Sequence, residues 1–254
     1  QGQTNRILLE KFQNGDKLRI SKFLSSKNIG SRKDIEKLIM EKRISLNGII
    51  ITTPITFVDE TDLIYLDNKL INTKQKLEIV KYYKPVGFIT SHKKQDDKSI
   101  IFENLPAKYK NFKTAGRLDY NSEGLLILST NGEITRKLEL PKNKFQRKYE
   151  VTISGDFKSE NLQMISSGIK IKNMLYKPFK YYIKSNTKNT VILELILIEG
   201  KNREIRKLME YIKLKVTKLK RIEYGPFKLN ELKPGEIHSA TKPEINNYLN
   251  NTRI

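Results

Sequence analysis

The first apolar residues of the chain recur with the spacing of a short helix. This pattern covers residues 18–24 and ends before Gly30. A second helix is predicted to begin after Ser31, a good N-cap residue, because Asp34 follows three positions later as a capping-box partner. Gly30 is therefore expected to lie in a tight turn between two helices.

Strand patterns follow the two helices. Residues 44–46 alternate between apolar and polar side chains, an Asn-Gly pair then marks a hairpin turn, and residues 49–51 begin the return strand. Residues 62–66 are predicted to form a further strand. The sequence thus predicts a small helix–turn–helix and hairpin domain over residues 17–70.

A second domain is expected after a polar linker at residues 71–78, and it extends from residue 79 to residue 254. Strand and helix patterns are mixed there without regular alternation, which favours an α+β fold over a doubly wound sheet. The predicted strands cover residues 79–83, 125–128, 191–197 and 216–224, and the predicted helices cover residues 133–140 and 204–212. Residues 191–197 are mostly apolar, so this strand is expected to be buried on both faces.

The charge of the chain indicates a class of binding partner. The 254 residues carry a formal net charge of +21, which favours a polyanion such as nucleic acid. A lysine-rich composition that places charge on any solvated face is the alternative. The charge is uneven, with nine basic and three acidic residues over 17–48, and nine basic and two acidic residues over 200–221. Two basic patches therefore favour a phosphate-bearing partner.

Several classes of protein are excluded or disfavoured. The chain has no cysteine and only two histidines, which argues against disulfides, thiolate metal sites and histidine-rich metal centres. No apolar run approaches the roughly 18–20 residues that a membrane span needs, and residues 1–12 lack the apolar stretch of a signal peptide. We expect a cytoplasmic, monomeric protein without a membrane segment, a metal or a cofactor.

The strongest candidate for chemistry is Asp119. It follows Arg117 in a loop rich in turn residues, and the chain then enters the apolar strand at residues 125–128. An isolated aspartate in such a loop is more often a cap or turn residue than a catalytic one. The surrounding sequence changes that assessment.

Residues 116–126 closely resemble the Gly-Arg-Leu-Asp-x-x-Ser-x-Gly-Leu-Leu motif of pseudouridine synthases. Further segments resemble the other motifs of that family in the same order: residues 83–87, 130–133, 148–151, 199–209 and 219–225. Tyr83 stands where the family usually has Asn, and the segment at 130–133 is one residue shorter than its motif. Residues 17–70 resemble the S-four RNA-binding domain. The combination resembles the RsuA/RluB-type branch, and residues 84–91 and 98–102 are most similar to its RluB-like enzymes.

This resemblance implies both a fold and a reaction. The fold would be the small RNA-binding domain followed by a mixed, mainly antiparallel sheet flanked by helices. The reaction would isomerise uridine to pseudouridine in ribosomal RNA, or in a ribosome-assembly intermediate, with the large-subunit 23S RNA as target. Two alternatives remain open: a synthase acting on small-subunit 16S RNA, and a non-catalytic RNA-binding or ribosome-assembly protein.

The resemblance also implies roles for individual residues. Asp119 would act as the nucleophile, or as the base in a glycal-type elimination, and Arg206 would form its ion pair. Tyr149 would stack on the flipped base or transfer a proton, although a core aromatic is an equally good interpretation of its local pattern. The implied substrate-binding residues are Arg117, Leu219 and Lys148. Leu219 is hard to distinguish from an ordinary core residue.

Contacts to the rest of the RNA are expected from basic side chains in both domains. Each of them could instead be an ordinary solvated charge. The candidates in the first domain are Arg19, Lys22, Arg32, Lys33 and Lys37, and those in the second are Arg203, Lys207, Lys220 and Arg221.

Overall fold

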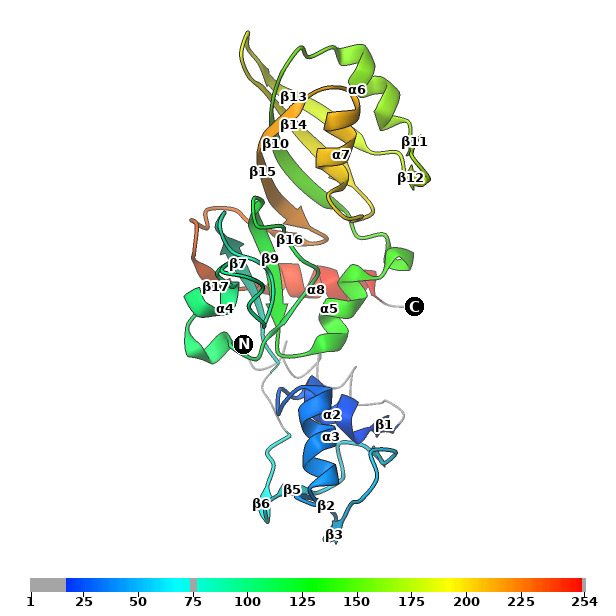
Figure 1. Ribbon diagram of the computed structural model, residues 1–254, viewed down its shortest axis with the longest axis vertical. Helices are drawn as coiled ribbons and strands as arrows, with labels where there is room; N and C mark the ends of the chain where they lie inside the picture. Colours follow the sequence, from blue (N-terminus) through cyan, green and yellow to red (C-terminus); the bar gives the residue numbers. More distant parts are fainter. Residues whose placement is uncertain (1–16, 74–76, 253–254) are drawn as a thin grey trace. The chain divides into compact units, whose positions relative to one another are not determined.

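The structure, a computed structural model, describes residues 17–73 and 77–252 (Figure 1). The chain divides into two compact units. Of the described residues, the first unit contains 17–73, 77–79, 111–113 and 129–134, and the second contains 80–110, 114–128 and 135–252.

The first unit begins with two packed helices. Strand β1 (Leu18–Arg19) leads into α2 (Ile20–Ser26), and α3 (Arg32–Met40) follows after a short turn. Ser31 caps α3: its Oγ accepts a hydrogen bond from Asp34 N at 3.2 Å, and Ser31 N donates to Asp34 Oδ2 at 3.1 Å. The predicted capping box and helical pair are confirmed.

A small sheet completes this unit. Its strands are β2 (Ile44–Leu46), β3 (Ile49–Ile50), β5 (Ile64–Leu66) and β6 (Lys69–Leu70), in the order β3-β2-β5-β6, while β4 (Phe57–Val58) pairs with β1. The apolar faces of both helices and the sheet share one core, formed by Ile20, Phe23, Leu24, Ile35, Ile39, Ile44, Ile51, Val58 and Ile64. The hairpin predicted around Asn47 and Gly48 is confirmed.

The second unit is built on a nine-stranded sheet. Its strands are β7 (Ile79–Lys84), β8 (Lys113–Thr114), β9 (Glu123–Ser129), β10 (Arg147–Ser154), β13 (Lys180–Asn186), β14 (Val191–Leu197), β15 (Lys215–Tyr224), β16 (Phe227–Lys228) and β17 (Ile237–Ser239). The main order is β13-β14-β10-β15-β9-β7-β17, with β16 on β15 and β8 on β9. Strand β15 runs parallel to β9 and antiparallel to β10 and β16, so the sheet is mixed. The predicted α+β fold with a mixed, mainly antiparallel sheet is confirmed.

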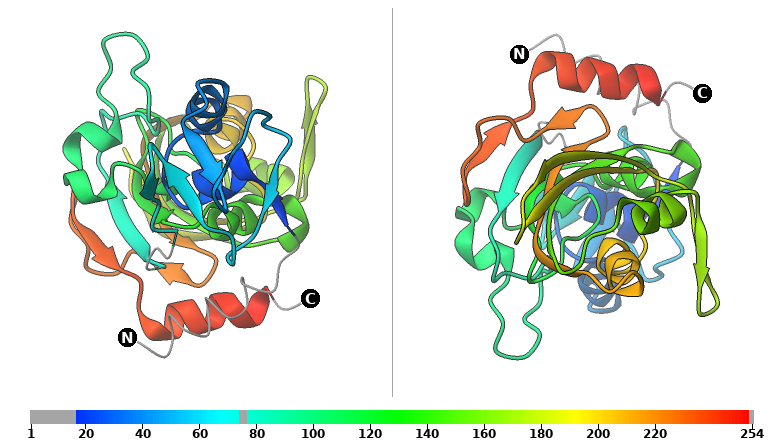
Figure 2. Two further views of the ribbon diagram at one scale, coloured as in Figure 1. Left: turned by 90° about the horizontal axis from the view of Figure 1, so that it is seen from below. Right: turned by 90° about the horizontal axis from the view of Figure 1, so that it is seen from above.

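Helices and a projecting hairpin flank this sheet. The helices are α4 (Ile101–Asn104), α5 (Gly132–Glu139), α6 (Ser159–Ser166), α7 (Glu204–Tyr211) and α8 (Lys242–Asn251), and the hairpin is β11 (Ile169–Ile171) with β12 (Met174–Tyr176). Figure 2 shows α6 and α7 on one face of the part formed by β13, β14, β10 and β15. Buried residues such as Val151, Leu193, Leu195, Leu208 and Met209 join these strands and α7 in one core.

Strand β14 corrects one expectation. Val191, Leu193, Leu195 and Leu197 are buried, but the residues between them are only half-buried. Glu194 lies on that second face and pairs with Lys148 of β10 at 3.3 Å. The prediction that this strand is buried on both faces is therefore wrong, because its second face carries ion pairs instead of a second core.

The junction of β9 and β15 depends on Gly124. Gly124 lies opposite Arg221 in the parallel pair and has φ +105°, in the region that favours glycine. A Cβ atom at this position would lie 2.3 Å from the carbonyl oxygen of Arg221. The absence of a side chain therefore lets β9 approach β15 directly after the loop that carries Asp119.

Candidate active site

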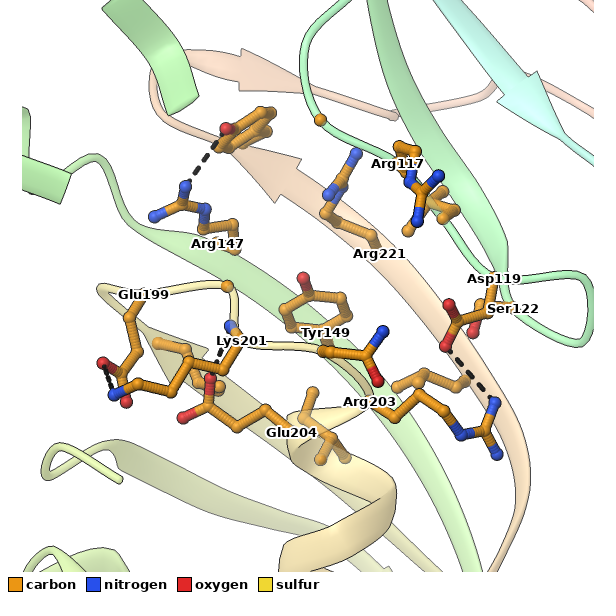
Figure 3. Close-up of a pocket in the computed structure, with 18 of the residues that line it drawn as sticks. Arg117, Asp119, Ser122, Arg147, Tyr149, Glu199, Lys201, Arg203, Glu204 and Arg221 are labelled. Atoms are coloured by element: carbon orange, nitrogen blue, oxygen red, sulfur yellow. Dashed lines mark hydrogen bonds and ion pairs between the residues drawn. The ribbon is translucent and has the colours of Figure 1, made fainter. Parts of the chain in front are cut away.

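The predicted catalytic loop opens onto a cavity of about 380 Å³ in the second unit (Figure 3). The walls come from residues 116–119 and Ser122, from strands β10 and β15, and from the turn at residues 199–203 that leads into α7. Six of the predicted site residues line it: Arg117, Asp119, Tyr149 and Leu219, together with Arg203 and Arg221, which were predicted as RNA contacts. The volume falls within the roughly 300–1,000 Å³ of typical small-molecule sites.

The loop that carries Asp119 is held by hydrogen bonds to its backbone. Lys84, which is fully buried, donates from Nζ to the carbonyl oxygens of Ser122 at 2.7 Å and Pro85 at 2.8 Å. Thr90 Oγ1 donates to Leu118 O at 3.0 Å and accepts from Leu118 N at 3.2 Å. Burial lowers the pKa of Lys84 to about 8, against the opposing effect of Asp119 and Glu123.

The ion pair of Asp119 differs from the expected one. Its Oδ2 lies 3.5 Å from Nη1 of Arg203, whereas Nη2 of Arg206 donates to Asn121 O at 3.0 Å and lies 3.4 Å from Ser122 Oγ. Arg203 directly precedes α7 in a left-handed conformation with φ 51°. This places its side chain at the cavity, while Arg206 lies inside the first turn of the helix and faces the loop backbone. The prediction that Arg206 pairs with Asp119 is wrong in this structure.

Arg206 nevertheless remains electrostatically coupled to the site. Desolvation lowers its pKa, the nearby Arg203 acts in the same direction, and Asp119 acts against both. Its Nε is buried without a hydrogen-bond partner. Arg206 thus supports the backbone of the loop that carries Asp119 and contributes positive charge near this carboxylate.

Tyr149 and Leu219 form an apolar wall of the cavity. They come from the neighbouring strands β10 and β15, where Tyr149 is opposite Arg221 and Val151 is opposite Leu219, so all four share one face of the sheet. Leu219 is buried and Tyr149 is half-buried; both also pack with the core beneath α7. The core and pocket interpretations of these two residues therefore both apply.

Lys148 does not reach this cavity. Side chains alternate along β10, so Lys148 points to the face opposite Tyr149. Its Nζ lies 3.3 Å from Glu194 and 3.7 Å from Glu223, both on the neighbouring strands. The structure contradicts the expectation that Lys148 binds the substrate in this cavity.

Arg221 is a structural residue rather than a free phosphate contact. It is only 4% exposed, its Nε donates to Leu125 O at 2.8 Å, and its guanidinium lies 4.7 Å from the centroid of the Tyr224 ring. Arg147 contacts the same ring at 4.8 Å and donates to Tyr224 Oη at 3.1 Å. The alternation that places Arg221 on the face of Tyr149 also buries it, which contradicts its predicted exposure to phosphate.

Sequence reasoning missed an acidic pair beside the cavity. Glu199 and Glu204 are 9% and 5% exposed, and their side chains are hydrogen-bonded to each other. Desolvation and the hydrogen bond to Glu199 raise the pKa of Glu204 to about 8. Desolvation also acts on Glu199, but hydrogen bonds from Lys201 and the Lys177 backbone hold its pKa below the usual value. Both glutamates lie in the segment that resembles a family motif, and this is the signal that could have indicated them.

The remaining predicted RNA contacts are available to solvent to different degrees. In the first unit, Arg19, Arg32, Lys33 and Lys37 are exposed and Lys22 is half-buried. In the second, Lys207 is exposed, and half-buried Lys220 lies 5.7 Å from the Tyr83 ring. Among residues 17–73 and 77–252, no group of three acidic or histidine side chains could hold a metal ion, and no helix is long and apolar enough to cross a membrane.

Comparison with known proteins assigns the family. A family model described as RNA pseudouridylate synthase matches residues 78–211, and a model of the S4 domain matches residues 18–64. The chain belongs to the RNA pseudouridylate synthase family. The two matches together support its RsuA-type group, and the protein is therefore an enzyme that forms pseudouridine in RNA.

Individual relatives agree along almost the whole chain. An uncharacterized RNA pseudouridine synthase of Rickettsia bellii is 42% identical over 88% of this chain and 97% of its own length. One from Aquifex aeolicus is 31% identical over 90% of this chain and 92% of its own length. A crystal structure of a pseudouridylate synthase has a TM-score of 0.66 at 24% identity, covers 91% of this chain and 99% of that chain, and supports the fold.

Proposed function

We propose that this pseudouridine synthase acts on ribosomal RNA, and specifically on a uridine of the large-subunit 23S RNA, with Asp119 as the catalytic carboxylate. The observation that carries the catalytic assignment is the position of Asp119 beside Arg203 on the wall of a cavity that Tyr149 and Leu219 also line. The choice of ribosomal RNA is supported by the RsuA/RluB-type motifs, and the choice of the large subunit by residues 84–91 and 98–102.

The cavity accounts for the handling of the base. A uridine inside a helix must leave its stack before an enzyme can reach the glycosidic bond. The ring of Tyr149 offers a flat surface to the flipped base, and Leu219 closes the same wall. Arg117, which is exposed on the cavity rim, would contact the backbone phosphate or occupy the space that the base leaves.

Asp119 would then break the bond between N1 and C1′. As a nucleophile it would attack C1′; as a base it would remove the proton on C2′ and leave a glycal. In the first route the ester bond between Asp119 and C1′ breaks as C5 bonds to C1′, and in the second Asp119 returns the proton to C2′ as that bond forms. In both routes the uracil turns, C5 loses its proton and N1 gains one, so the product is an isomer of the substrate. Arg203 would stabilise the carboxylate before the attack and as the uracil leaves.

The domain organisation proposed here has an RNA-binding domain at residues 17–70, a linker at 71–78 and a catalytic domain at 79–254. The exposed side chains of Arg19, Arg32 and Lys33 would contact phosphates. Replacing all three by glutamine should reduce the salt dependence of RNA binding by about two to three in the slope of log K against log salt. An unchanged slope would contradict a phosphate-binding role for these residues.

Mapping of pseudouridine in cells with and without the protein tests the RNA assignment. Loss of a modification in 23S RNA is the expected result, and a lost modification in 16S RNA would favour the small-subunit alternative. No change in either RNA would contradict a ribosomal substrate. Because the target base must be reachable, we propose free ribosomal RNA or an assembly intermediate in the cytoplasm as the substrate, bound by a monomer.

A further inference from the structure

The carboxyl pair of Glu199 and Glu204 is a feature that the reaction itself does not require. Glu199 follows strand β14, and Glu204 is the first residue of α7. Both are almost completely buried at the cavity wall, and their side chains share a hydrogen bond. Two carboxyl groups can share a hydrogen bond only when one of them carries a proton, because an ionised carboxylate has no donor.

The surrounding donors indicate which glutamate is charged. Glu199 accepts from the Lys177 backbone N at 2.8 Å and from Lys201 Nζ at 2.6 Å. Glu204 accepts one backbone hydrogen bond, from Lys201 N at 3.1 Å. Hydrogen bonds from a backbone amide and an ammonium stabilise the charged form of Glu199, while burial favours the neutral form of Glu204. Glu204 therefore holds the proton and donates it to Glu199.

The hydrogen bond between the Glu204 and Glu199 side chains closes the turn that carries Arg203. Residues 200–203 all line the cavity and are bracketed by the two glutamates. Lys201 N bonds to the Glu204 carboxyl, and Glu204 N donates to Lys201 O at 3.2 Å. Arg203 has a left-handed backbone, which costs a residue with a side chain roughly 1–3 kcal/mol and persists only where neighbouring contacts enforce it. The carboxyl pair supplies such contacts next to the residue that reaches Asp119.

We propose that Glu204 is a positioning residue whose neutral side chain, hydrogen-bonded to Glu199, holds the turn at residues 200–203 so that Arg203 reaches Asp119. The proposal rests on the catalytic role proposed for Asp119. Glu204 touches neither the base nor the reacting atoms in this account; it acts through Arg203.

Ionisation of Glu204 would disrupt the turn. The charged groups around it are Glu199 after β14 and Lys201 within the turn, while Arg147 of β10 lies close to Gly200. Lys201 is already engaged by Glu199 and by the carbonyl of Leu175. A second negative charge would therefore face Glu199 without a free cation between them, and the shared hydrogen bond would be lost.

The test is the pH dependence of single-turnover pseudouridine formation by the full chain. Wild type should become about tenfold slower at pH 9 than at pH 7, because only the protonated form of Glu204 holds the turn. Glu204→Gln keeps a neutral hydrogen-bond donor, so it should retain the rate near pH 7 and lose this alkaline decline. Glu204→Leu should be at least about tenfold slower at every pH. Glu210→Gln, on the exposed side of the same helix, is the matched control and should follow wild type.

The glutamine variant also separates Glu204 from Lys84, which titrates in the same range. An alkaline decline that persists unchanged in Glu204→Gln would overturn the proposal, and so would wild-type rates in a folded Glu204→Leu. If the leucine variant does not fold, the glutamine profile alone decides. Failure of the catalytic assignment would be recognised separately, as full activity of Asp119→Asn.

Discussion

Gly124 is the point at which the parallel strands β9 and β15 meet, and its replacement by alanine is expected to be severely destabilising. Its φ of +105° is unfavourable for any residue with a side chain, and the added Cβ would lie 2.3 Å from the backbone oxygen of Arg221. Gly87 provides a matched control in the same unit. Its φ is +94°, but no atom lies within 4 Å of the position that a Cβ would take.

The difference between the two variants isolates the close approach of the strands. Both share the conformational cost of alanine at positive φ, roughly 1–3 kcal/mol. At Gly124 the strands must also separate by about 1 Å to restore ordinary contact, an overpacking that costs about 1–3 kcal/mol or more. The separation weakens the buried hydrogen bond from Arg221 Nε to Leu125 O, worth about 1.5–3 kcal/mol. Gly124→Ala should thus be about 2.5–6 kcal/mol less stable than Gly87→Ala.

Urea unfolding of the two full-length variants measures this difference directly. We expect Gly87→Ala to unfold cooperatively at a midpoint lowered only by the conformational cost of alanine at positive φ, and Gly124→Ala to unfold far earlier or to remain unfolded. Because the junction directly follows the loop of Asp119, the rate of pseudouridine formation should also fall in Gly124→Ala. Free energies of unfolding within about 1 kcal/mol of each other would refute the steric argument.

Three further predictions concern the charged groups of the site. Arg203→Ala should lower the single-turnover rate by about tenfold and Arg203→Lys by less, whereas equal rates for all three proteins would contradict the ion pair with Asp119. Lys84→Met leaves two carbonyls without their donor and should cost about 2–4 kcal/mol in urea unfolding. Because the pKa of Lys84 is depressed to about 8, wild-type stability should gain a contribution as pH rises from about 8 to 10.5 that the methionine variant lacks. Burial raises the pKa of Glu204 to about 8 in the folded protein, from 4.5 in the unfolded chain. As the pH rises from 4.5 to 8, the contribution of Glu204 to the free energy of unfolding should therefore fall by up to ~1.4 kcal/mol per pH unit. Glu204→Gln should not show this slope in thermal unfolding.

Local chemistry and alternation made much of the fold predictable. Ser31 and Asp34 are only three positions apart, so the sequence alone predicts their capping box, and the structure forms both of its hydrogen bonds. The strand at residues 191–197 was located by its apolar positions. Its second face was misjudged because Glu194 pairs with Lys148 and Lys184 on the two neighbouring strands, which no local pattern reveals.

The site was predictable as far as the motif fixed it. The loop of Asp119 and the wall of Tyr149 and Leu219 do meet at one cavity. The partner of Asp119 was not predictable, because the choice between Arg203 and Arg206 depends on a left-handed residue just before a helix.

The incorrect predictions for Lys148 and Arg221 have a simpler origin. Strand alternation alone separates Lys148 from Tyr149, and the same rule places Arg221 on the buried face. The hydrogen bond between Glu199 and Glu204 was beyond sequence reasoning, because it depends on how the turn between them folds.

Pseudouridine formation by purified protein on transcribed ribosomal RNA tests the central claim most directly. Wild type should convert one uridine of 23S RNA. Asp119→Asn should convert none while binding the same RNA with nearly unchanged affinity, because the substitution removes the reactive carboxylate but none of the basic side chains. Asp97→Asn, in an exposed loop, is the control and should match wild type. Undiminished conversion by Asp119→Asn would contradict the account.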